Sequence, residues 1–551
     1  MRMKMVVGAL AAVGGLCELQ ARTFEVAAWR GETVTARVPD FAELGEAPNG
    51  IGVRRGTLKL VKYAPVAESL QRLEVYDRVS WDSDDDGPRV VEISVPSDAE
   101  PGIYTCGMMN IRVIDRVLPP AREWGYFLDL WQHPWTVSRY HGVKPFSPGH
   151  YRKMRPVWEL LASAGQKTIT TTLLPEAWDH QCRDAYGTMI GRVKKDDGSW
   201  RFDYSVFDEY VEFCRSCGLG PAICCYTMCP WGYVVRWQNE NGKGLSCVAK
   251  PGTKEFEEYW GDFLGDFARH LADKGWLKDA YISMDERSIE DVRMIGEFIR
   301  RHAPDLRISM AGNRLPSKYG VTIDDFCMIL GDGVSGEYVK EAAERRGRGL
   351  VTTYYVCCGP AHPNTFMASG PGEAFWLGAF PAMVGLDGFL RWAWNSWPQD
   401  PKEDATFGGW RAGDAFLCYP DGEPSWRFLE LRNGIVAAEK TAILKRAGLF
   451  KEELDKLALR YKVGEAVAGK SDYVGIRNAT LALVNAQPKE PRISVFAHYV
   501  QQIAKGLRIS KAEAASRLYA LGIRGFDTAY TDPALPELAS TCLKPINLYG
   551  A

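Results

Sequence analysis

The spacing of hydrophobic residues changes near residue 120 of this 551-residue chain. Before that point, stretches such as ETVTARVPDF, GTLKLVKYAPV and PRVVEISVPS alternate apolar and polar positions and are interrupted by Pro, Gly and Asp. A period of two is typical of strands that bury one face. We therefore predict that residues 22–120 form an all-β sandwich.

From residue 121 onward, short apolar runs alternate with segments of helical periodicity, such as YRKMRPVWELLASAG and SIEDVRMIGEFIRRHAP. Strands that alternate with helices in this number predict a (β/α)8 barrel, an α/β fold, over residues 121–425. An open doubly wound sheet is the alternative, but no glycine-rich phosphate loop follows the first strand. The eight runs are GYFLDLW, QKTITTTLL, GPAICCYTM, KDAYISMD, LRISMAG, DFCMILGD, GLVTTYYVCC and LDGFLRWAW.

Two further patterns follow the barrel. Residues 426–487 have helical periodicity and are predicted to form a helical segment. After the linker VNAQPKEPR, residues 491–551 begin a new alternation of strand and helix that stops after three strands, too few to close a barrel. This stretch resembles the start of a xylose-isomerase-like sugar phosphate isomerase barrel, so a partial β/α segment is expected there.

The first residues have the pattern of a secretory signal peptide. Arg2 and Lys4 precede an apolar run that ends at Leu16, and cleavage is expected after Ala21. The protein is thus predicted to be exported, to the periplasm or beyond, with a cytoplasmic location as the alternative. No later segment reaches the ~20 apolar residues of a membrane span.

Composition narrows the possible partners. The net charge of −2, without a long basic stripe, argues against a nucleic acid partner. Eighteen Trp are available to stack on sugar rings, although core packing must account for many of them. Of the fourteen Cys, the pairs Cys224-Cys225 and Cys357-Cys358 lie in apolar, strand-like runs, so most are predicted to be buried thiols.

Two neighbouring carboxylates, Asp285 and Glu286, stand where the fourth barrel strand ends. Helix capping is one interpretation, because acids before a helix complement its free N–H groups. A catalytic pair is the other, because barrel enzymes place their working groups at the carboxyl ends of strands. The same rim collects Trp, Tyr, Asn and carboxylates, the composition of a sugar subsite, and the sequence has no H-E-x-x-H or paired His for a metal.

The motifs YISMDE, TYYVCCGPAHPNTF, GLDGFLRWAWNSWPQDP and WRAGDAFLCYPDG resemble glycoside hydrolase family 123. The resemblance covers roughly residues 22–450. It implies an exo-acting, retaining enzyme that releases terminal β-linked N-acetylgalactosamine, or a related N-acetylhexosamine, from a glycan or glycoconjugate. In that family the substrate's own 2-acetamido oxygen attacks the anomeric carbon and forms an oxazolinium intermediate. No cofactor and no metal are expected.

The resemblance also assigns roles to residues. Glu286 is expected to be the general acid/base, with a raised pKa, and Asp285 is expected to remain ionised and to hold the acetamide N–H. Tyr355 is expected near the acetamide group, with Tyr354 as an alternative because the facing of this strand is not fixed. The remaining predicted substrate-binding residues are Trp392, Trp394, Asn395, Asn313, Trp131 and His133.

Two other functions stay open. A glycosidase acting on sugars without an acetamide group would need a carboxylate nucleophile about 5 Å from Glu286, and Asp332 and Asp129 are the candidates. A non-catalytic carbohydrate-binding protein would keep the aromatic cleft, although the Asp285–Glu286 pair argues against it.

Overall fold

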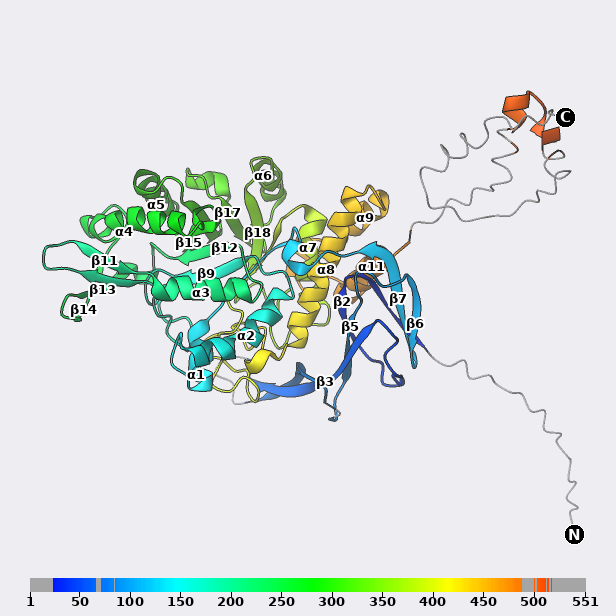
Figure 1. The fold of residues 1–551 in the computed structure, drawn as a ribbon, viewed down its shortest axis with the longest axis horizontal. Helices are drawn as coiled ribbons and strands as arrows, with labels where there is room; N and C mark the ends of the chain where they lie inside the picture. The colour runs from blue at the N-terminus through cyan, green and yellow to red at the C-terminus, as the bar shows by residue number, and fades with distance from the viewer. Residues whose placement is uncertain are drawn as a thin grey trace, which may run out of the picture. The chain divides into compact units, whose positions relative to one another are not determined.

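The computed structural model describes residues 23–65, 71–83 and 85–487, together with a few positions between 500 and 517. The chain divides into two units, residues 1–485 and 486–551 (Figure 1). The predicted signal peptide, residues 1–21, lies outside the described residues, as does most of the predicted segment 491–551. In the second unit, Val500, Ala504 and Ala514 form a small apolar cluster.

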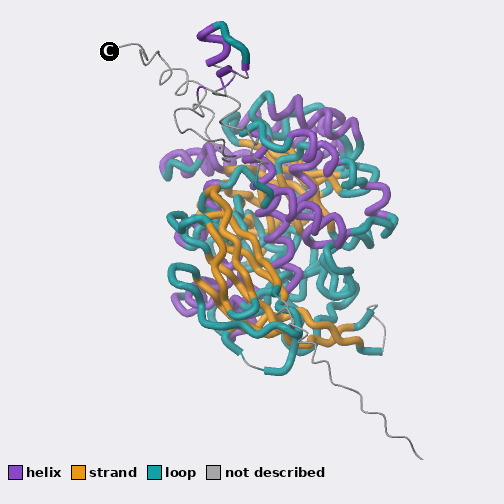
Figure 2. Tube along the Cα trace, turned by 90° about the vertical axis from the view of Figure 1, so that its right-hand side faces the viewer, coloured by secondary structure: helices purple, strands orange, loops and turns teal. Residues whose placement is uncertain are grey.

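The N-terminal part of the first unit is a β-sandwich, whose strands are among those drawn in orange in Figure 2. Its two sheets enclose a core that includes Val91, Ile93 and Ile111. One sheet has the order β1-β7-β6 and the other the antiparallel order β2-β5-β3-β4. The strands are β1 (Phe24–Arg30), β2 (Thr33–Arg37), β3 (Gly52–Tyr63), β4 (Leu73–Trp81), β5 (Arg89–Ser94), β6 (Gly102–Cys106) and β7 (Met109–Val117).

The second part is an eight-stranded, all-parallel barrel, which confirms the predicted fold class. Each of the eight apolar runs contains one of its strands, because strands covered on both faces are almost continuously apolar. The order is β8-β19-β18-β17-β16-β15-β12-β9. The strands are β8 (Phe127–Leu130), β9 (Thr168–Thr172), β12 (Ala222–Tyr226), β15 (Ala280–Asp285), β16 (Arg307–Gly312), β17 (Asp325–Ile329), β18 (Val351–Val356) and β19 (Gly388–Arg391).

Two buried glutamines close the seam between β8 and β9. Gln166 Oε1 accepts a hydrogen bond from the backbone N–H of Leu130 at 3.0 Å, and its Nε2 donates to the Leu130 carbonyl at 3.2 Å. Gln132 Oε1 accepts from the N–H of Thr170 at 2.9 Å. Side-chain amides thus satisfy backbone groups that a peptide ladder would otherwise pair.

Helices cover the outside of the barrel (Figure 1). The two helical segments named above appear as α2 and α5, and residues 426–487 contain α8 to α11. The helix α8 is buried along most of its length because it packs against α7 and against β2 and β4 of the sandwich. None of the described helices is long and apolar enough to cross a membrane. The helices are α1 (Pro134–His141), α2 (Pro148–Ala162), α3 (Ser205–Ser216), α4 (Lys254–Asp273), α5 (Ile289–His302), α6 (Gly336–Arg346), α7 (Glu373–Val384), α8 (Trp426–Arg446), α9 (Lys451–Ala458), α10 (Val463–Val467) and α11 (Tyr473–Val484).

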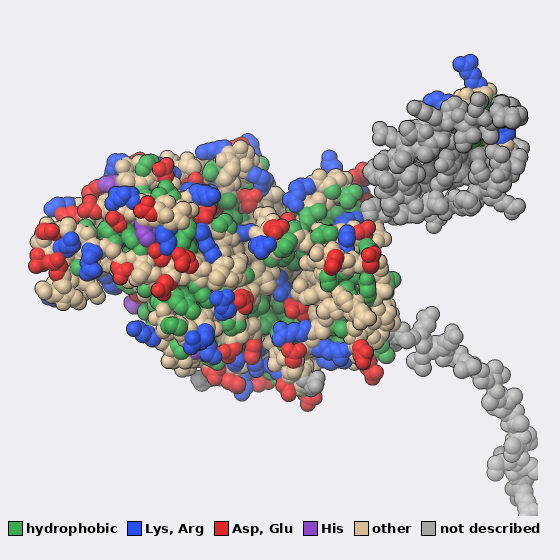
Figure 3. Space-filling model, in the orientation of Figure 1, with side chains coloured by type: hydrophobic (Ala, Val, Ile, Leu, Met, Phe, Trp, Pro, Cys, Tyr) green, Lys and Arg blue, Asp and Glu red, His purple; other side chains and the backbone are tan. Residues whose placement is uncertain are grey.

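A four-stranded sheet that the sequence pattern did not predict is built from the segments that follow β9 and β12. Its order is β11-β10-β13-β14, and it extends from the barrel at the left of Figure 1. On the face shown in Figure 3, acidic and basic side chains are intermingled across the barrel and this sheet. The strands are β10 (Gly191–Lys194), β11 (Trp200–Asp203), β13 (Val234–Asn239) and β14 (Gly244–Val248).

A buried ion pair joins the sandwich to α8, the helix that follows the barrel. Asp77 on β4 accepts hydrogen bonds from Arg427 Nε at 2.9 Å and Nη2 at 3.0 Å, and from the Tyr419 hydroxyl at 2.6 Å. Arg427 Nη1 also donates to the carbonyls of Gly413 and Phe416, both at 3.1 Å. The sandwich therefore holds a loop that follows the last barrel strand.

The substitution Asp77→Ala is expected to lower the free energy of unfolding by about 3–5 kcal/mol, because it leaves the Arg427 guanidinium buried without its counter-charge. Chemical denaturation monitored by tryptophan fluorescence measures the change. Glu159→Ala is the control, because Glu159 pairs with Arg155 on the exposed face of α2, where such pairs contribute less than about 1 kcal/mol. Equal losses from both substitutions would contradict the prediction.

Candidate active site

A pocket of about 130 Å³ opens at the carboxyl ends of the barrel strands, where the predicted site residues were expected. Asp285 closes β15 and Glu286 follows it, and both carboxylates lie in the pocket wall. Aromatic side chains supply much of the remaining wall. The lining residues are Trp131, Gln181, Trp231, Asp285, Glu286, Ala311, Tyr355, Cys357, Cys358, Leu390, Trp392 and Trp410.

A left-handed backbone conformation allows both carboxylates to face the same pocket. Successive residues of a strand point to opposite sides, so Asp285 and Glu286 would diverge if β15 continued. Glu286 instead has φ 46°, and its N–H donates to the Ala311 carbonyl of β16 at 2.9 Å. The cap of the following helix α5 is Ser288, whose hydroxyl accepts the N–H of Asp291 at 3.0 Å. The capping role considered for the acids is thus filled by Ser288.

Tyr355 contacts Glu286 directly. The phenol hydroxyl of Tyr355 donates a hydrogen bond to Glu286 Oε1. Burial, and then the Glu286 charge, raise the pKa of Tyr355 far above its usual value, so the phenol remains a donor. With Oε1 occupied as an acceptor, a proton carried by Glu286 belongs on Oε2.

The surroundings of Asp285 shift the pKa of its carboxyl group. The side chain is partly open to the pocket, but barrel atoms surround it elsewhere, and this desolvation, followed by repulsion from Glu286, raises its pKa to about 7. Arg287 and the indole N–H groups of Trp231 and Trp178 oppose the rise. At neutral pH a substantial fraction of Asp285 therefore carries a proton, whereas the sequence analysis expected the carboxylate to remain ionised.

The aromatic walls differ in how they are held. Trp131 packs its ring against Trp178 at 5.1 Å and Tyr226 at 4.7 Å, so it is fixed from behind. Trp392 donates its indole N–H to Asp414 Oδ1 at 3.0 Å and lies 5.6 Å from the ring of Trp410. Flat apolar faces beside two carboxylates match what a sugar ring needs from a binding site.

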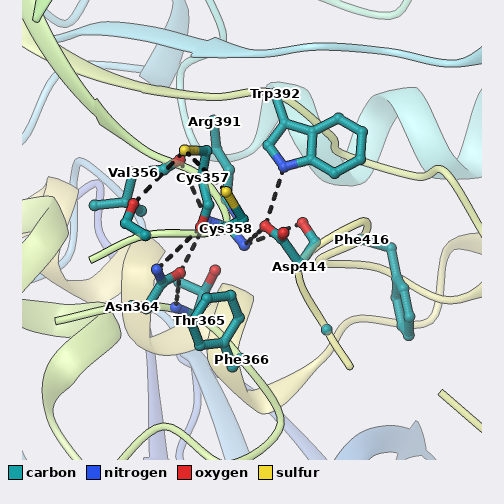
Figure 4. A network of polar contacts seen from close by, with 12 residues as sticks. Val356, Cys357, Cys358, Asn364, Thr365, Phe366, Arg391, Trp392, Asp414 and Phe416 are labelled. Carbon is teal, nitrogen blue, oxygen red and sulfur yellow. Dashed lines mark hydrogen bonds and ion pairs between the residues drawn. The ribbon is translucent and has the colours of Figure 1, made fainter. Parts of the chain in front are cut away.

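A buried arginine organises one side of the pocket (Figure 4). Arg391, at the end of β19, donates through Nη2 to Asp414 Oδ1 at 2.7 Å, the same oxygen that receives the Trp392 indole. Its Nη1 donates to Asn364 Oδ1 at 3.0 Å, and Asn364 Nδ2 donates to the Cys357 carbonyl at 3.1 Å. One guanidinium thus fixes both Trp392 and the loop after β18.

Three of the predicted substrate-binding residues line the pocket, namely Tyr355, Trp131 and Trp392. Tyr354 faces the opposite side of β18, where its hydroxyl donates to the Leu377 carbonyl of α7 at 2.6 Å. Trp394 is fully buried against Phe428 of α8. The structure therefore brings neither Tyr354 nor Trp394 to the pocket.

The other three predicted residues also lie outside the lining. Asn395 bridges the backbone of His133, accepting its N–H at 2.8 Å and donating to its carbonyl at 3.0 Å. His133 stacks on Tyr186 at 3.7 Å, and burial lowers its pKa to about 4, so the ring is neutral. Asn313, just past the end of β16, is exposed.

The carboxylates considered as nucleophiles do not line the pocket either. Asp129 is buried on β8, where Thr168 donates a hydrogen bond to it, and burial raises its pKa to about 6. Asp332 is exposed in the loop after β17. No three His, Cys, Asp or Glu side chains among the residues that the structure describes are grouped to hold a metal ion.

Five polar or aromatic lining residues were not among the predicted site residues, and one of them is Trp231, which follows β12. Gln181 and Trp410 lie in long loops after β9 and β19, where no periodicity indicates which residues turn inward. Cys357 and Cys358 directly follow β18 and were interpreted as buried thiols, but Cys358 is exposed because the strand ends at Val356. Their position two and three residues after Tyr355 is the feature of the sequence from which their place at the pocket could have been predicted.

The comparisons with known proteins agree with this geometry. A family model described as glycoside hydrolase 123, catalytic domain, matches residues 131–444. A family 123 glycoside hydrolase from Clostridium perfringens, analysed for the details of glycolipid glycan hydrolysis, is 24% identical with a TM-score of 0.74; the match covers 84% of this chain and 93% of that one.

More distant structures include a Clostridium thermocellum endo-1,4-β-D-xylanase, which is 10% identical with a TM-score of 0.32 over 74% of this chain and 85% of that one. None of the curated proteins compared with the sequence matches it.

Proposed function

This chain belongs to glycoside hydrolase family 123 and is a glycoside hydrolase, and we propose that it releases a terminal β-linked N-acetylgalactosamine, or a related N-acetylhexosamine, with retention of configuration. In this proposal the acetamido oxygen of the substrate acts as the nucleophile and forms an oxazolinium intermediate. The aglycone proposed is a glycan or glycoconjugate, as in the glycolipid glycans studied with the C. perfringens relative.

The observation that carries the proposal is the placement of the carboxylates. Among the described residues that line the pocket, Asp285 and Glu286 are the only carboxylates, and they follow one another on one wall. A retaining enzyme with its own nucleophile needs two carboxyl groups about 5–5.5 Å apart that flank the scissile bond. Adjacent residues of one wall do not supply groups on two sides of a sugar, so a nucleophile from the substrate is favoured.

The two carboxylates then perform different steps. Glu286 gives the proton on Oε2 to the glycosidic oxygen as the bond breaks, while its Oε1 stays bonded to Tyr355. Asp285 accepts the acetamide N–H, which orients the amide oxygen toward the anomeric carbon and offsets the positive charge of the ring. Glu286, now ionised, takes a proton from the water that opens the intermediate.

This division predicts the acid limb of the pH profile. Protonated Asp285 can still accept the amide N–H through its carbonyl oxygen, but it lacks the negative charge that offsets the developing charge of the oxazolinium. The pKa of about 7 belongs to the free enzyme. We expect kcat/KM for 4-nitrophenyl N-acetyl-β-D-galactosaminide to fall about tenfold for each pH unit below roughly 7, because kcat/KM reports free-enzyme ionisations. A profile that is flat between pH 5 and 7 would contradict this assignment.

The proposal is tested with matched substrates and one inhibitor. The enzyme is expected to cleave the nitrophenyl N-acetyl-β-galactosaminide and to leave the corresponding β-galactoside intact, because only the former carries the nucleophile. A thiazoline that mimics the oxazolinium is expected to inhibit strongly. Equal cleavage of both substrates without thiazoline inhibition would favour a carboxylate nucleophile, and binding of amino sugars without any turnover would favour a non-catalytic protein.

A further inference from the structure

Two adjacent cysteines form part of the wall of the sugar pocket. Cys357 and Cys358 line the same cavity as Glu286 and Trp392, and their sulfur atoms are 3.8 Å apart. The structure describes twelve cysteines, and all of them are free thiols. Among these twelve, Cys358 is the one whose side chain is exposed. A chemical group attached to this sulfur would stand at the pocket and not in a remote surface loop.

The loop that carries the pair is held in place (Figure 4). Asn364 Nδ2 donates to the carbonyls of Cys357 at 3.1 Å and Pro360 at 2.7 Å. Arg391 Nη1 donates to the Val356 carbonyl at 3.3 Å, just before the pair. The buried guanidinium thus holds the backbone directly before the pair and, through Asn364, the backbone after it, so the two sulfurs keep their positions beside the catalytic wall.

The environment of the pair favours a thiolate on Cys358. A hydrogen bond from the Cys357 thiol lowers the pKa of Cys358 to about 7, against burial and the charges of Asp414 and Glu286, which raise it. Burial raises the pKa of most other described cysteines, for example Cys225 to about 12. Since the thiolate is the reactive form, Cys358 combines exposure with reactivity.

We propose that Cys358 is a modification site for small-molecule disulfides, such as glutathione disulfide, and that the mixed disulfide closes the sugar pocket. The Cys358 thiolate attacks one sulfur of the disulfide, the S–S bond of the reagent breaks, and the second sulfur leaves as a thiolate that takes a proton from water. Cys358 is oxidised to a mixed disulfide and half of the reagent is reduced to a thiol, so electrons and atoms balance. Only the activity readout rests on the proposed function; the modification itself does not.

Cys357 is a positioning residue in this reaction. Cys357→Ala removes the hydrogen-bond donor and is expected to slow the reaction of Cys358 about tenfold at pH 7, because the lost thiolate fraction outweighs the gain in nucleophilicity that a higher pKa brings. Cys357→Ser keeps a donor and is expected to react within about threefold of the wild-type rate. A purely structural role for Cys357 would not separate Ala from Ser in this way.

The experiment treats the full-length protein with glutathione disulfide and follows it by peptide mass mapping and by hydrolysis of the nitrophenyl N-acetyl-β-galactosaminide. The first adduct is expected at Cys358, with at least a tenfold loss of activity that dithiothreitol restores. Each variant is compared with its own untreated rate. Cys358→Ser should resist inhibition, whereas Cys247→Ser, which removes a half-buried thiol on β14 outside the pocket, should be inhibited like the wild type.

Three results would overturn the proposal: a first adduct on another cysteine, full modification of Cys358 without loss of activity, or equal inhibition of Cys358→Ser. If the untreated enzyme cleaves no amino sugar, the proposed function fails by itself. The mapping still decides whether Cys358 is the reactive thiol, and its reaction rate against pH, with an expected midpoint near 7, gives a second and independent answer.

Discussion

Replacing Glu286 with glutamine is expected to lower kcat on an N-acetyl-β-galactosaminide with an unactivated aglycone by about 10³–10⁴-fold. Proton transfer by a positioned carboxyl typically contributes 10²–10⁴-fold, and Glu286 serves in both steps of the proposed mechanism. Glutamine has the same shape, and its carbonyl oxygen can still accept the hydrogen bond from Tyr355. KM is therefore expected to change little.

The leaving group provides the internal control for this variant. A nitrophenolate departs without help from an acid, so Glu286→Gln should lose much less activity on the nitrophenyl substrate in the first step, and the intermediate should accumulate as a burst. Steady-state and pre-steady-state rates on the two substrates measure the difference. Equal losses on both substrates would show that Glu286 does not protonate the leaving group.

The substitution Asp285→Asn is expected to lower kcat about 10²–10³-fold, the usual cost of removing one preorganised electrostatic contact from a developing charge. Asparagine can still accept the amide N–H through its carbonyl oxygen, but it lacks the negative charge that offsets the oxazolinium. The thiazoline should bind this variant more weakly by a similar factor, because it resembles the intermediate. Unchanged thiazoline affinity would contradict the role given to Asp285.

The same substitution, which lowers activity, is expected to raise the stability of the folded protein at high pH. The pKa of Asp285 is about 7 in the folded protein and near 3.8 when exposed, so the folded state holds the proton more tightly and loses stability as the pH rises from about 4 to 7. Asp285→Asn removes this loss. We expect the variant to be more stable than the wild type by up to ~4 kcal/mol at pH 8 and nearly equal at pH 4, since one pH unit of pKa difference corresponds to about 1.4 kcal/mol.

Denaturant unfolding at the two pH values tests this expectation. Asp332→Asn is a suitable control, because Asp332 is exposed in the loop after β17. A variant that is less stable than the wild type at pH 8 would show that the Asp285 charge is well solvated. Opposite changes in activity and stability, by contrast, would mark Asp285 as a group retained for its chemistry.

Sequence periodicity predicted the barrel because each of its strands lies in an apolar run of seven to ten residues, and helical periodicity follows several of these runs. It did not predict β10 and β11, which are four residues long and mix charged with apolar side chains. β11 pairs with β10, and β10 in turn pairs with β13, a contact distant in sequence that no local pattern indicates.

The site residues also divide into those that the sequence pattern placed correctly and those that it did not. Asp285, Glu286, Tyr355, Trp131 and Trp392 were predicted as site residues, and each is at a strand end or directly after one. Trp394 is two residues beyond Trp392 and would share its face if β19 continued, but β19 ends at Arg391 and strand alternation no longer applies.

Asn313 lies beyond the end of β16 in the same way, so its direction depends on loop geometry that no local pattern encodes. Strand alternation predicts that Tyr354 and Tyr355 point to opposite sides of β18, but it does not say which of them faces the pocket. The hydrogen bond from the Tyr354 hydroxyl to the Leu377 carbonyl of α7 shows that Tyr354 points outward.

Near its start the β8–β9 seam is joined by a backbone hydrogen bond from the Lys167 N–H to the Leu128 carbonyl at 2.9 Å. Toward the carboxyl end it depends on the two glutamine side chains and therefore on their length. Neighbouring strands in a peptide ladder lie about 4.8 Å apart whatever their sequence, but a gap spanned by an amide side chain narrows or widens with one methylene. Trp131 follows β8 immediately and belongs to the pocket wall. Gln166 is buried and does not line the pocket, so shortening it to asparagine would loosen this end of the seam and shift Trp131 without removing any side chain from the pocket wall.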